Sequence, residues 1–222
     1  MRRRASPAPA LVHFASTHRR GLLATAGVLG LMNLLRWQLA RFTVEKPRYE
    51  VLRRAGPVEI RRYPPMVFAE TEVEGRFDEA LREGFRRLAR YIFGSNDRAA
   101  NAPARLIRTA HEKLAMTAPV TTQPQNGART VAFVMPSRRS MTDLPRPHDP
   151  RVHLRQQDAQ TIAALKFRGR YGEGRVREAA GELMAELAKH GLRAKGEPTF
   201  AGYDPPFTLP PLRRNEVWVE LV

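Results

Sequence analysis

The sequence contains no cysteine, and this absence excludes several kinds of site. A chain without thiols forms no disulfide, binds no metal through thiolates and uses no cysteine nucleophile. The sequence also lacks a nucleophile-elbow motif, a catalytic triad, metal-ligand spacing and a glycine-rich phosphate loop. We therefore expect that the protein is not an enzyme.

Acidic residues are missing from residues 1–42, which hold seven arginines. The whole chain has a formal net charge of +16, and such a charge attracts any polyanion, including nucleic acid, anionic lipid and a carboxylate-bearing ligand. No zinc-finger spacing, RNP-like strand or helix-turn-helix signature is present. The sequence therefore predicts no specific nucleic-acid partner.

A long apolar run is also missing from this first segment. The uncharged stretch from Gly21 to Leu35 is shorter than the roughly 20 residues that span a bilayer. Extension to Phe42 reaches that length if Arg36 and Arg41 snorkel to the interface. We expect residues 1–42 to be a single membrane anchor, in a bacterial inner membrane. A signal peptide, a transit peptide and a buried or disordered helix are the alternatives.

Residues 43–222 form the predicted folded domain, and two periods of hydrophobicity divide it. Apolar residues recur at three-four spacing from Phe77 to Ile92 and from Val176 to Ala188, which predicts two amphipathic helices that end near Gly94 and Gly191. Strands are predicted at residues 49–63 (two strands around Gly56-Pro57), 66–75, 113–122, 129–137, 151–157, 161–172, 198–203 and 216–222. The Asn126-Gly127 pair predicts a tight hairpin.

The order of these elements repeats. A strand that ends in glycine, an amphipathic helix and two further strands occur in residues 67–137 and again in residues 162–222. Such a repeat predicts a pseudo-two-fold α+β domain in which the helices cover one antiparallel sheet. The sheet is expected to be either curved or closed into a barrel.

Three stretches carry a resemblance to a known family. They are "YEVLRRAGPVEIRRYPPMVFAET", "KLAMTAPVTT" with "FVMPS", and "GYDPPFTLPPLRRNEVWVEL". Their order and spacing resemble the SOUL/heme-binding protein family over residues 47–221. The resemblance implies a distorted antiparallel β-barrel of two similar halves with two flanking helices. It also implies non-covalent binding of heme or a related tetrapyrrole, as a carrier or buffer.

The resemblance places the ligand in a shallow apolar groove between the first helix and the proline-rich loop "DPPFTLPP". Heme needs an apolar face and cations near its propionates, and the first helix and the loop supply both kinds of side chain. The predicted heme-binding residues are Arg82, Phe85, Arg86, Ala89, Arg90, Phe207 and Leu209.

The sequence does not identify an axial ligand for the iron. His111 and Met116 are candidates, although each residue type is more often structural. A monomer is expected. Two other functions stay open: a small-molecule-binding domain like the effector modules of bacterial regulators, and an interaction domain that does not bind heme.

Overall fold

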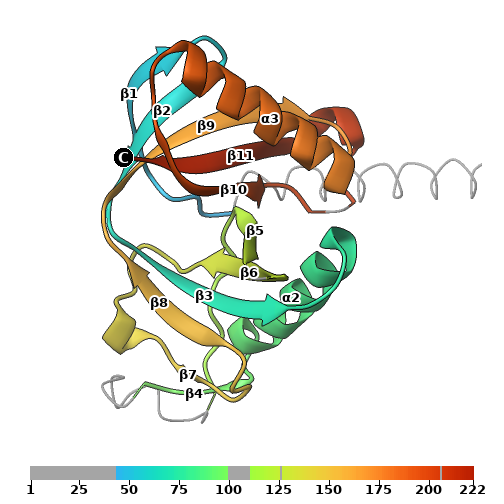
Figure 1. Ribbon diagram of the computed structural model, residues 1–222. Helices are drawn as coiled ribbons and strands as arrows, with labels where there is room; N and C mark the ends of the chain where they lie inside the picture. The colour runs from blue at the N-terminus through green and yellow to red at the C-terminus, as the bar shows by residue number, and fades with distance from the viewer. Residues whose placement is uncertain (1–43, 100–110, 126, 206) are drawn as a thin grey trace, which may run out of the picture. The chain divides into compact units, whose positions relative to one another are not determined.

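The structure, a computed structural model, describes residues 44–99, 111–125, 127–205 and 207–222 (Figure 1). Internal contacts divide the chain into two units, with the boundary between Thr43 and Val44. The predicted anchor, residues 1–42, lies outside the described residues. None of the helices in the described ranges is long and apolar enough to cross a membrane.

Nine strands form one antiparallel sheet, and two helices pack against it (Figure 1). The sheet strands are β1 (Glu50–Ala55), β2 (Val58–Tyr63), β3 (Met66–Val73), β5 (Val120–Gln125), β6 (Ala128–Val134), β8 (His153–Gln157), β9 (Gln160–Arg168), β10 (Ala194–Gly202) and β11 (Arg214–Leu221). The helices are α2 (Phe77–Ile92) and α3 (Glu173–Lys189), and β4 (Asn96–Asp97) pairs with β7 (Arg146–Pro147). Short 3-10 turns, η2 and η3, lie at Met141–Asp143 and Pro210–Leu212.

The predicted duplication is confirmed by the strand order. The sheet runs β1-β2-β9-β11-β10-β5-β6-β3-β8, so β2-β9-β11-β10 on one side mirrors β8-β3-β6-β5 on the other. The first half is β3, α2, β5 and β6, and the second half is β9, α3, β10 and β11. Helix α2 contacts β3 and β6, whereas α3 contacts β9, β10 and β11. The two halves meet where β10 pairs with β5.

The predicted closed barrel is wrong. Among the described residues, β1 pairs only with β2 and β8 pairs only with β3, so both ends of the sheet stay open. Exposed arginines on β1, Arg53 and Arg54, are typical of an edge strand that does not accept a further partner. In addition, Pro64 and Pro65 interrupt the chain between β2 and β3, because proline has no N–H to continue a ladder.

The segment before β5 also differs from the prediction. Residues 113–122 were expected to form one strand, but only Val120 onward does so. The preceding backbone bonds to other parts of the chain: the Leu114 N–H donates to the Ile92 carbonyl and the Ala118 N–H to the Glu45 carbonyl. Pro119 lacks an N–H, which also prevents an earlier start of the ladder. The predicted hairpin is confirmed by the pairing of Gln125 with Ala128, while Asn126 lies outside the described residues.

Helix α2 has the predicted bounds, and its packing on the sheet depends on a glycine. Asp78 and Glu79 lie in the first turn and Arg90 in the last, as the helix dipole favours. Gly84 faces β6, where an added Cβ would lie 2.6 Å from Val131 Cβ. The absence of a side chain at Gly84 therefore lets α2 lie directly against β6.

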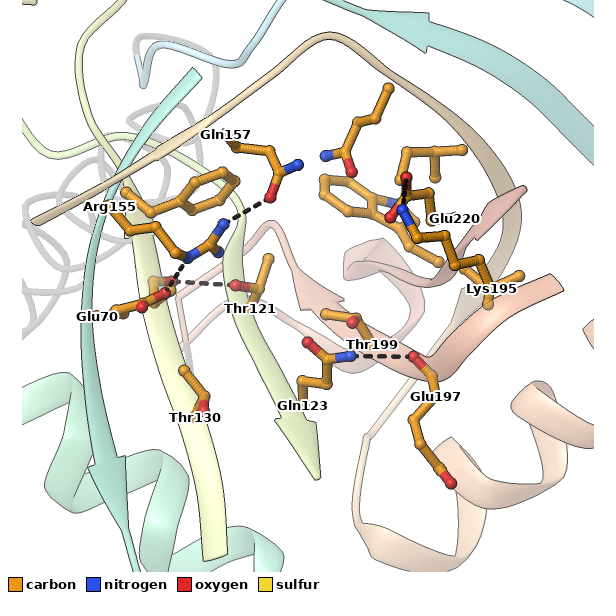
Figure 2. Close-up of a pocket in the computed structure, with 16 residues that line it drawn as sticks. Glu70, Thr121, Gln123, Thr130, Arg155, Gln157, Lys195, Glu197, Thr199 and Glu220 are labelled. Atoms are coloured by element: carbon orange, nitrogen blue, oxygen red, sulfur yellow. Dashed lines mark hydrogen bonds and ion pairs between the residues drawn. The ribbon is translucent and has the colours of Figure 1, made fainter. Parts of the chain in front are cut away.

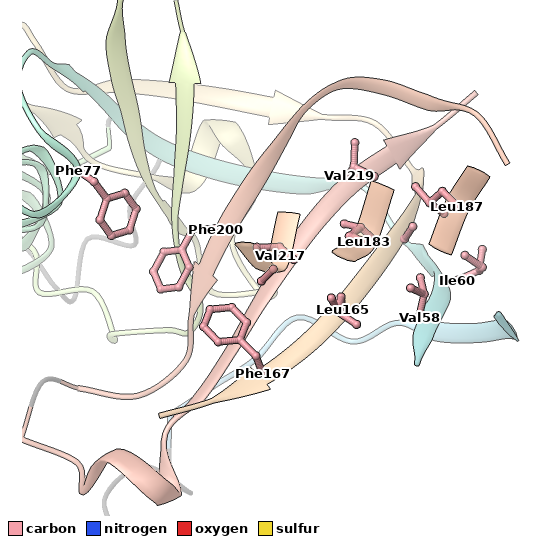
Figure 3. Close-up of a cluster of buried hydrophobic side chains, with 12 residues drawn as sticks. Val58, Ile60, Phe77, Leu165, Phe167, Leu183, Leu187, Phe200, Val217 and Val219 are labelled. Carbon is pink, nitrogen blue, oxygen red and sulfur yellow. The ribbon is translucent and has the colours of Figure 1, made fainter. Parts of the chain in front are cut away.

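Two hydrophobic clusters lie beneath the helices and a third uses other residues of the sheet. Beneath α3, Leu183 and Leu187 pack on Leu165, Val217 and their neighbours (Figure 3). Beneath α2, the cluster includes Leu88, Ile92 and Phe133. Fully burying one such side chain contributes about 1.5–3 kcal/mol, so these contacts fix both helices on the sheet. The third cluster is built around aromatic residues, among them Tyr63, Phe68, Tyr203 and Trp218.

Candidate functional site

The proline-rich loop, residues 203–213, connects β10 to β11 and is held at both ends. The Tyr203 N–H donates to the Arg214 carbonyl, and the Arg214 N–H donates to Asp204 Oδ2 at 2.6 Å. Arg213 Nε donates to the Thr208 carbonyl at 2.7 Å. These bonds lower the freedom of the loop before any ligand binds, which reduces the entropy cost of binding.

Side chains alternate in direction at the tip of this loop. Thr208 is buried, while its neighbours Phe207 and Leu209 are 48% and 50% exposed. Thr208 Oγ1 has no hydrogen-bond partner among the described residues. The burial of Thr208 thus turns two large apolar side chains toward solvent.

The register of the sheet places this loop beside the middle of α2. The Phe85 ring contacts the Phe133 ring, with 5.3 Å between their centroids. Phe133 pairs with Val120, and Val120 pairs with Gly202, the residue just before the loop. β5 is the one strand between β6, which lies beneath Phe85, and β10, where the loop starts. The distance from β6 to β10 is therefore two inter-strand spacings, or about 10 Å.

Two strand residues lie between α2 and the loop in the register of the sheet. Val120 and Gly202 are both half-buried, and both lie on the helix-covered face of the sheet. A Cβ at Gly202 would lie 3.2 Å from the Phe200 ring and would narrow the space. We call the space between α2, Val120, Gly202 and the loop the α2 groove.

The first turn of α2 also contacts the second half. The Phe77 ring lies 5.4 Å from the Phe200 ring, and the Tyr171 ring lies 5.0 Å from it. Burial raises the pKa of Tyr171, with a smaller contribution in the same direction from the Asp78 carboxylate. The Arg213 guanidinium stacks over Tyr171 at 5.9 Å. Tyr171 therefore links α2 to the base of the proline-rich loop.

The predicted arginines lie on the exposed side of α2, but they are not equivalent. Arg82 Nε donates to the Asp78 carbonyl, and Arg86 pairs with Glu83 at 2.5 Å. Arg90 is exposed, and no acidic side chain among the described residues forms an ion pair with it. Exposed pairs of this kind contribute little free energy, so Arg82 and Arg86 can exchange their partners for a ligand carboxylate at low cost.

Arg87 is different, because the chain uses it in the core. It is buried, and its guanidinium donates to Thr71 Oγ1 at 2.6 Å and to the Glu72 carbonyl. It also lies within ion-pair distance of Glu83 and Asp149. Arg87 therefore fixes α2 on β3 and is not available to a ligand.

A buried charge cluster lies beside the base of the loop. Glu216 is fully buried, and its carboxylate accepts hydrogen bonds from Arg61, Arg214, Tyr203 and Trp218. Burial opposes ionisation, but the hydrogen bond and charge of Arg61 and the charge of Arg214 outweigh it and lower the pKa of Glu216. The "YDPP" and "RRNEVW" segments are thus joined through one carboxylate.

Two of the described histidines lie close together near the end of α2. His111 and His148 are close together, with 5.5 Å between ring centroids, and His148 Nε2 is 2.9 Å from Asp97 Oδ1. His111 lies near Gly94, just beyond the end of α2. Met116 is half-buried and packs into the cluster beneath α2. The described residues contain no group of three or more side chains suited to hold a metal ion.

A separate cavity of about 150 Å³ opens on the other face of the sheet (Figure 2). The buried apolar residues of its lining are Phe68, Ala132, Ile162, Trp218 and Val219. Four of its five charged residues form two ion pairs, Arg155 with Glu70 and Lys195 with Glu220, and Glu197 is the fifth. A cavity of this volume holds a benzene-sized molecule, so it is too small for a tetrapyrrole.

Several residues of the α2 groove could not be assigned from the sequence. Phe133, Val120 and Gly202 have the pattern of ordinary strand residues, and only the register brings them beside Phe85. Conversely, the structure separates the predicted set: Phe85 contacts the floor, whereas Arg86 and Arg90 lie further around the exposed side of the helix.

These features define a duplicated α+β domain with exposed apolar side chains on its first helix and on the loop between β10 and β11. The sequence profile of the SOUL heme-binding protein family matches residues 44–220. The chain is 30% identical to heme-binding protein 2 of Homo sapiens over 190 residues, covering 79% of this chain and 85% of that protein. It is 32% identical to heme-binding protein 1 of Xenopus tropicalis over 168 residues, covering 72% and 81%. The chain therefore belongs to the SOUL heme-binding protein family.

A solved structure shares the fold at low sequence identity. The C-terminal domain of EcmrR superposes with a TM-score of 0.53 and 12% identity, covering 78% of this chain and 98% of that domain. This likeness supports the α+β architecture alone.

Proposed function

We propose that this protein binds heme non-covalently in the α2 groove and acts as a heme carrier or buffer. The observation that carries the proposal is the set of exposed apolar side chains on both sides of the groove: Phe85 on α2, with Phe207 and Leu209 on the loop. A flat apolar ring gains free energy when it covers such side chains. The family relatives are named heme-binding proteins, which supports heme as the ligand.

The charges near the groove suit a dicarboxylate ligand. Arg82 and Arg86 lie on the exposed side of α2, where they can meet the heme propionates with charge-assisted hydrogen bonds. Ala89 is half-buried one turn beyond Phe85 and leaves room for a ring. Arg90 adds a third cation at the end of the helix. The proposed site is shallow and open, as expected for a protein that releases its ligand again.

The role we propose is binding without catalysis. The groove side chains are apolar residues and arginines, and none of them is an acid-base pair suited to open the ring or remove the iron. We further propose that the protein acts as a monomer and that residues 1–42 hold it at a bacterial inner membrane. Deletion of residues 1–42 should release it from sedimented membranes, and continued sedimentation would contradict the anchor.

A hemin titration of the full chain, followed by its Soret band, tests the heme site. We expect a saturable shift near one equivalent. Combined substitution of Arg82, Arg86 and Arg90 by alanine should weaken it by about tenfold or more, because charge-assisted bonds to the propionates are lost. The matched control replaces exposed cations of the second half, Arg177, Lys189 and Arg193, by alanine and should leave binding unchanged. Equal losses in both variants would mean a non-specific charge effect.

A second candidate function is the binding of a small molecule in the 150 Å³ cavity. Its aromatic floor and hydrogen-bonding rim are the observation that favours this function. A thermal-shift screen of small ring compounds tests it, with Trp218→Leu as the variant that should abolish a true hit. If hemin stabilises the protein and no small compound does, this second function is excluded.

A further inference from the structure

Large exposed apolar side chains are concentrated on α2 and on the proline-rich loop. The described residues include nine such side chains, and five of them lie on α2, at its end or on the loop: Phe85, Phe93, Phe207, Leu209 and Leu212. The other four are Val51, Leu52, Met184 and Val222. Single exposed apolar residues are ordinary, but a group on two adjacent elements indicates a contact surface.

The exposed side of α2 carries two parallel stripes at four-residue spacing. The apolar stripe consists of Phe85, Ala89 and Phe93. The cationic stripe consists of Arg82, Arg86 and Arg90. Residues four apart lie above one another on a helix, so the two stripes run side by side along α2. No acid occurs between Glu83 and Gly94, so this half of the helix is purely cationic and apolar.

Helix α3 is the internal comparison, and it lacks this pattern. Its exposed positions include both signs of charge, among them Arg177, Glu178, Glu182 and Lys189. Met184 is its only large exposed apolar residue, and it is as exposed as Phe85, at 40%. The composition of α3 is therefore that of an ordinary solvated surface. The difference between the helices is specific to α2.

We propose that the α2 face of the folded domain docks on an anionic lipid bilayer. Phe85, Phe93, Phe207 and Leu209 would enter the headgroup boundary, and the cationic stripe would contact lipid phosphates. Aromatic side chains beside arginines are the composition that binds such an interface. This contact is separate from the predicted anchor, since it uses residues of the folded domain.

The bilayer is the occupant that the rest of the chain supports. Residues 1–43, which precede the folded domain, hold seven arginines, no acid and the uncharged run Gly21–Leu35. That composition favours the same anionic interface and would keep the domain close to it. This docking has one consequence, which rests on the proposed function. The α2 groove would face the bilayer, in which an apolar ligand such as heme dissolves.

The absence of cysteine makes a direct test possible in the full chain. Single cysteines at Phe93→Cys and Leu209→Cys are labelled with an environment-sensitive fluorophore, and Met184→Cys on α3 is the matched control. The proteins are mixed with phosphatidylglycerol vesicles that contain lipid-attached quenchers. We expect a blue shift and quenching at positions 93 and 209, and neither at position 184. Phosphatidylcholine vesicles should give a smaller response at 93 and 209.

The outcomes separate this proposal from the heme proposal. Equal responses at 93 and 184, or no response at 93 and 209 on anionic vesicles, would overturn the docking surface. A response at 93 to nucleic acid and not to vesicles would overturn it as well. Adding Phe93→Asp should make the label at 209 lose most of its blue shift, while the hemin titration of the unlabelled Phe93→Asp variant, which keeps Leu209, stays unchanged. Loss of the hemin shift in the unsubstituted protein would instead remove the heme site and leave the docking result standing.

Discussion

The two halves of the sheet share one architecture but differ in the connection between their last two strands. In the first half, β5 and β6 are joined by residues 126–127, whereas in the second half β10 and β11 are joined by residues 203–213. The long connection lies at the seam between the halves, beside the helix of the first half. The proposed α2 groove therefore combines a helix from one copy with a loop from the other, and the short β5–β6 connection offers no counterpart of that loop.

The interior of the two halves differs as well. Glu216 on β11 pairs with Ala201, and Ala201 pairs with Thr121, which pairs with Ala132 on β6. Ala132 is thus the pseudo-symmetric counterpart of Glu216. At this position the second half buries the Glu216 carboxylate beside two arginines, whereas the first half buries the methyl group of Ala132. The duplicated fold does not need the charge, so we infer that the charge cluster serves the loop that follows β10.

Substitution of Glu216 by alanine should give the largest effect on stability. It would leave Arg61, which is fully buried, without its main counter-ion, at a cost of about 3–5 kcal/mol in the free energy of unfolding. Urea denaturation measures this change. Glu220→Ala, which removes a partly exposed pair with Lys195, should cost less than about 1 kcal/mol. Similar losses in both variants would show that the cluster has no special role.

The two helices can be compared through their glycines. Gly84→Ala should destabilise the protein by about 1–3 kcal/mol, because the new Cβ would overlap Val131 of β6. Gly181→Ala on α3 meets no atom within 4 Å and should be neutral or stabilising by up to about 1 kcal/mol. Thermal unfolding of both variants checks the prediction. A destabilised Gly181→Ala would contradict the difference in packing between the helices.

The loop can be tested apart from the arginines. Replacement of Phe207 and Leu209 by serine should weaken hemin binding by roughly tenfold, since two half-exposed apolar side chains no longer cover the ring. The melting temperature should change little because neither side chain is in the core. Met184→Ser on α3 is the matched control, because it also replaces an exposed apolar side chain by serine. Unchanged hemin affinity in the double variant would move the site away from the loop.

Acidic pH should destabilise the second half by protonating Glu216. The loss of stability should be smaller than the loss caused by Glu216→Ala. The folded protein lowers the pKa of Glu216 from the ordinary value of 4.5. The stabilisation from this carboxylate is therefore complete above pH 4.5 and is lost as the pH falls through the lower folded pKa. Urea midpoints between pH 6 and pH 3 should fall more steeply for the natural chain than for Glu216→Gln. Parallel slopes would assign the acid sensitivity to other carboxylates.

Much of the fold could be predicted because local periodicity decides it. The bounds of α2 follow from the three-four spacing between Phe77 and Ile92, and Gly94 ends it with a positive φ of 119°. Helix α3 begins at Glu173, three residues before the predicted start at Val176, because its first turn is held by polar residues that carry no hydrophobic signal. Strand β5 begins late because residues 113–119 form their bonds with distant loops.

The set of elements, their repeat and the family can be predicted from the chain alone, since hydrophobic period, turn residues and motif spacing are local properties. Which surfaces meet depends on the folded arrangement. The sheet ends at β1 and β8 without closing, Arg87 is buried while Arg86 is exposed, and Val120 and Gly202 form a floor beside Phe85. These facts depend on strand register and on contacts between residues far apart in the chain, and no local pattern encodes them.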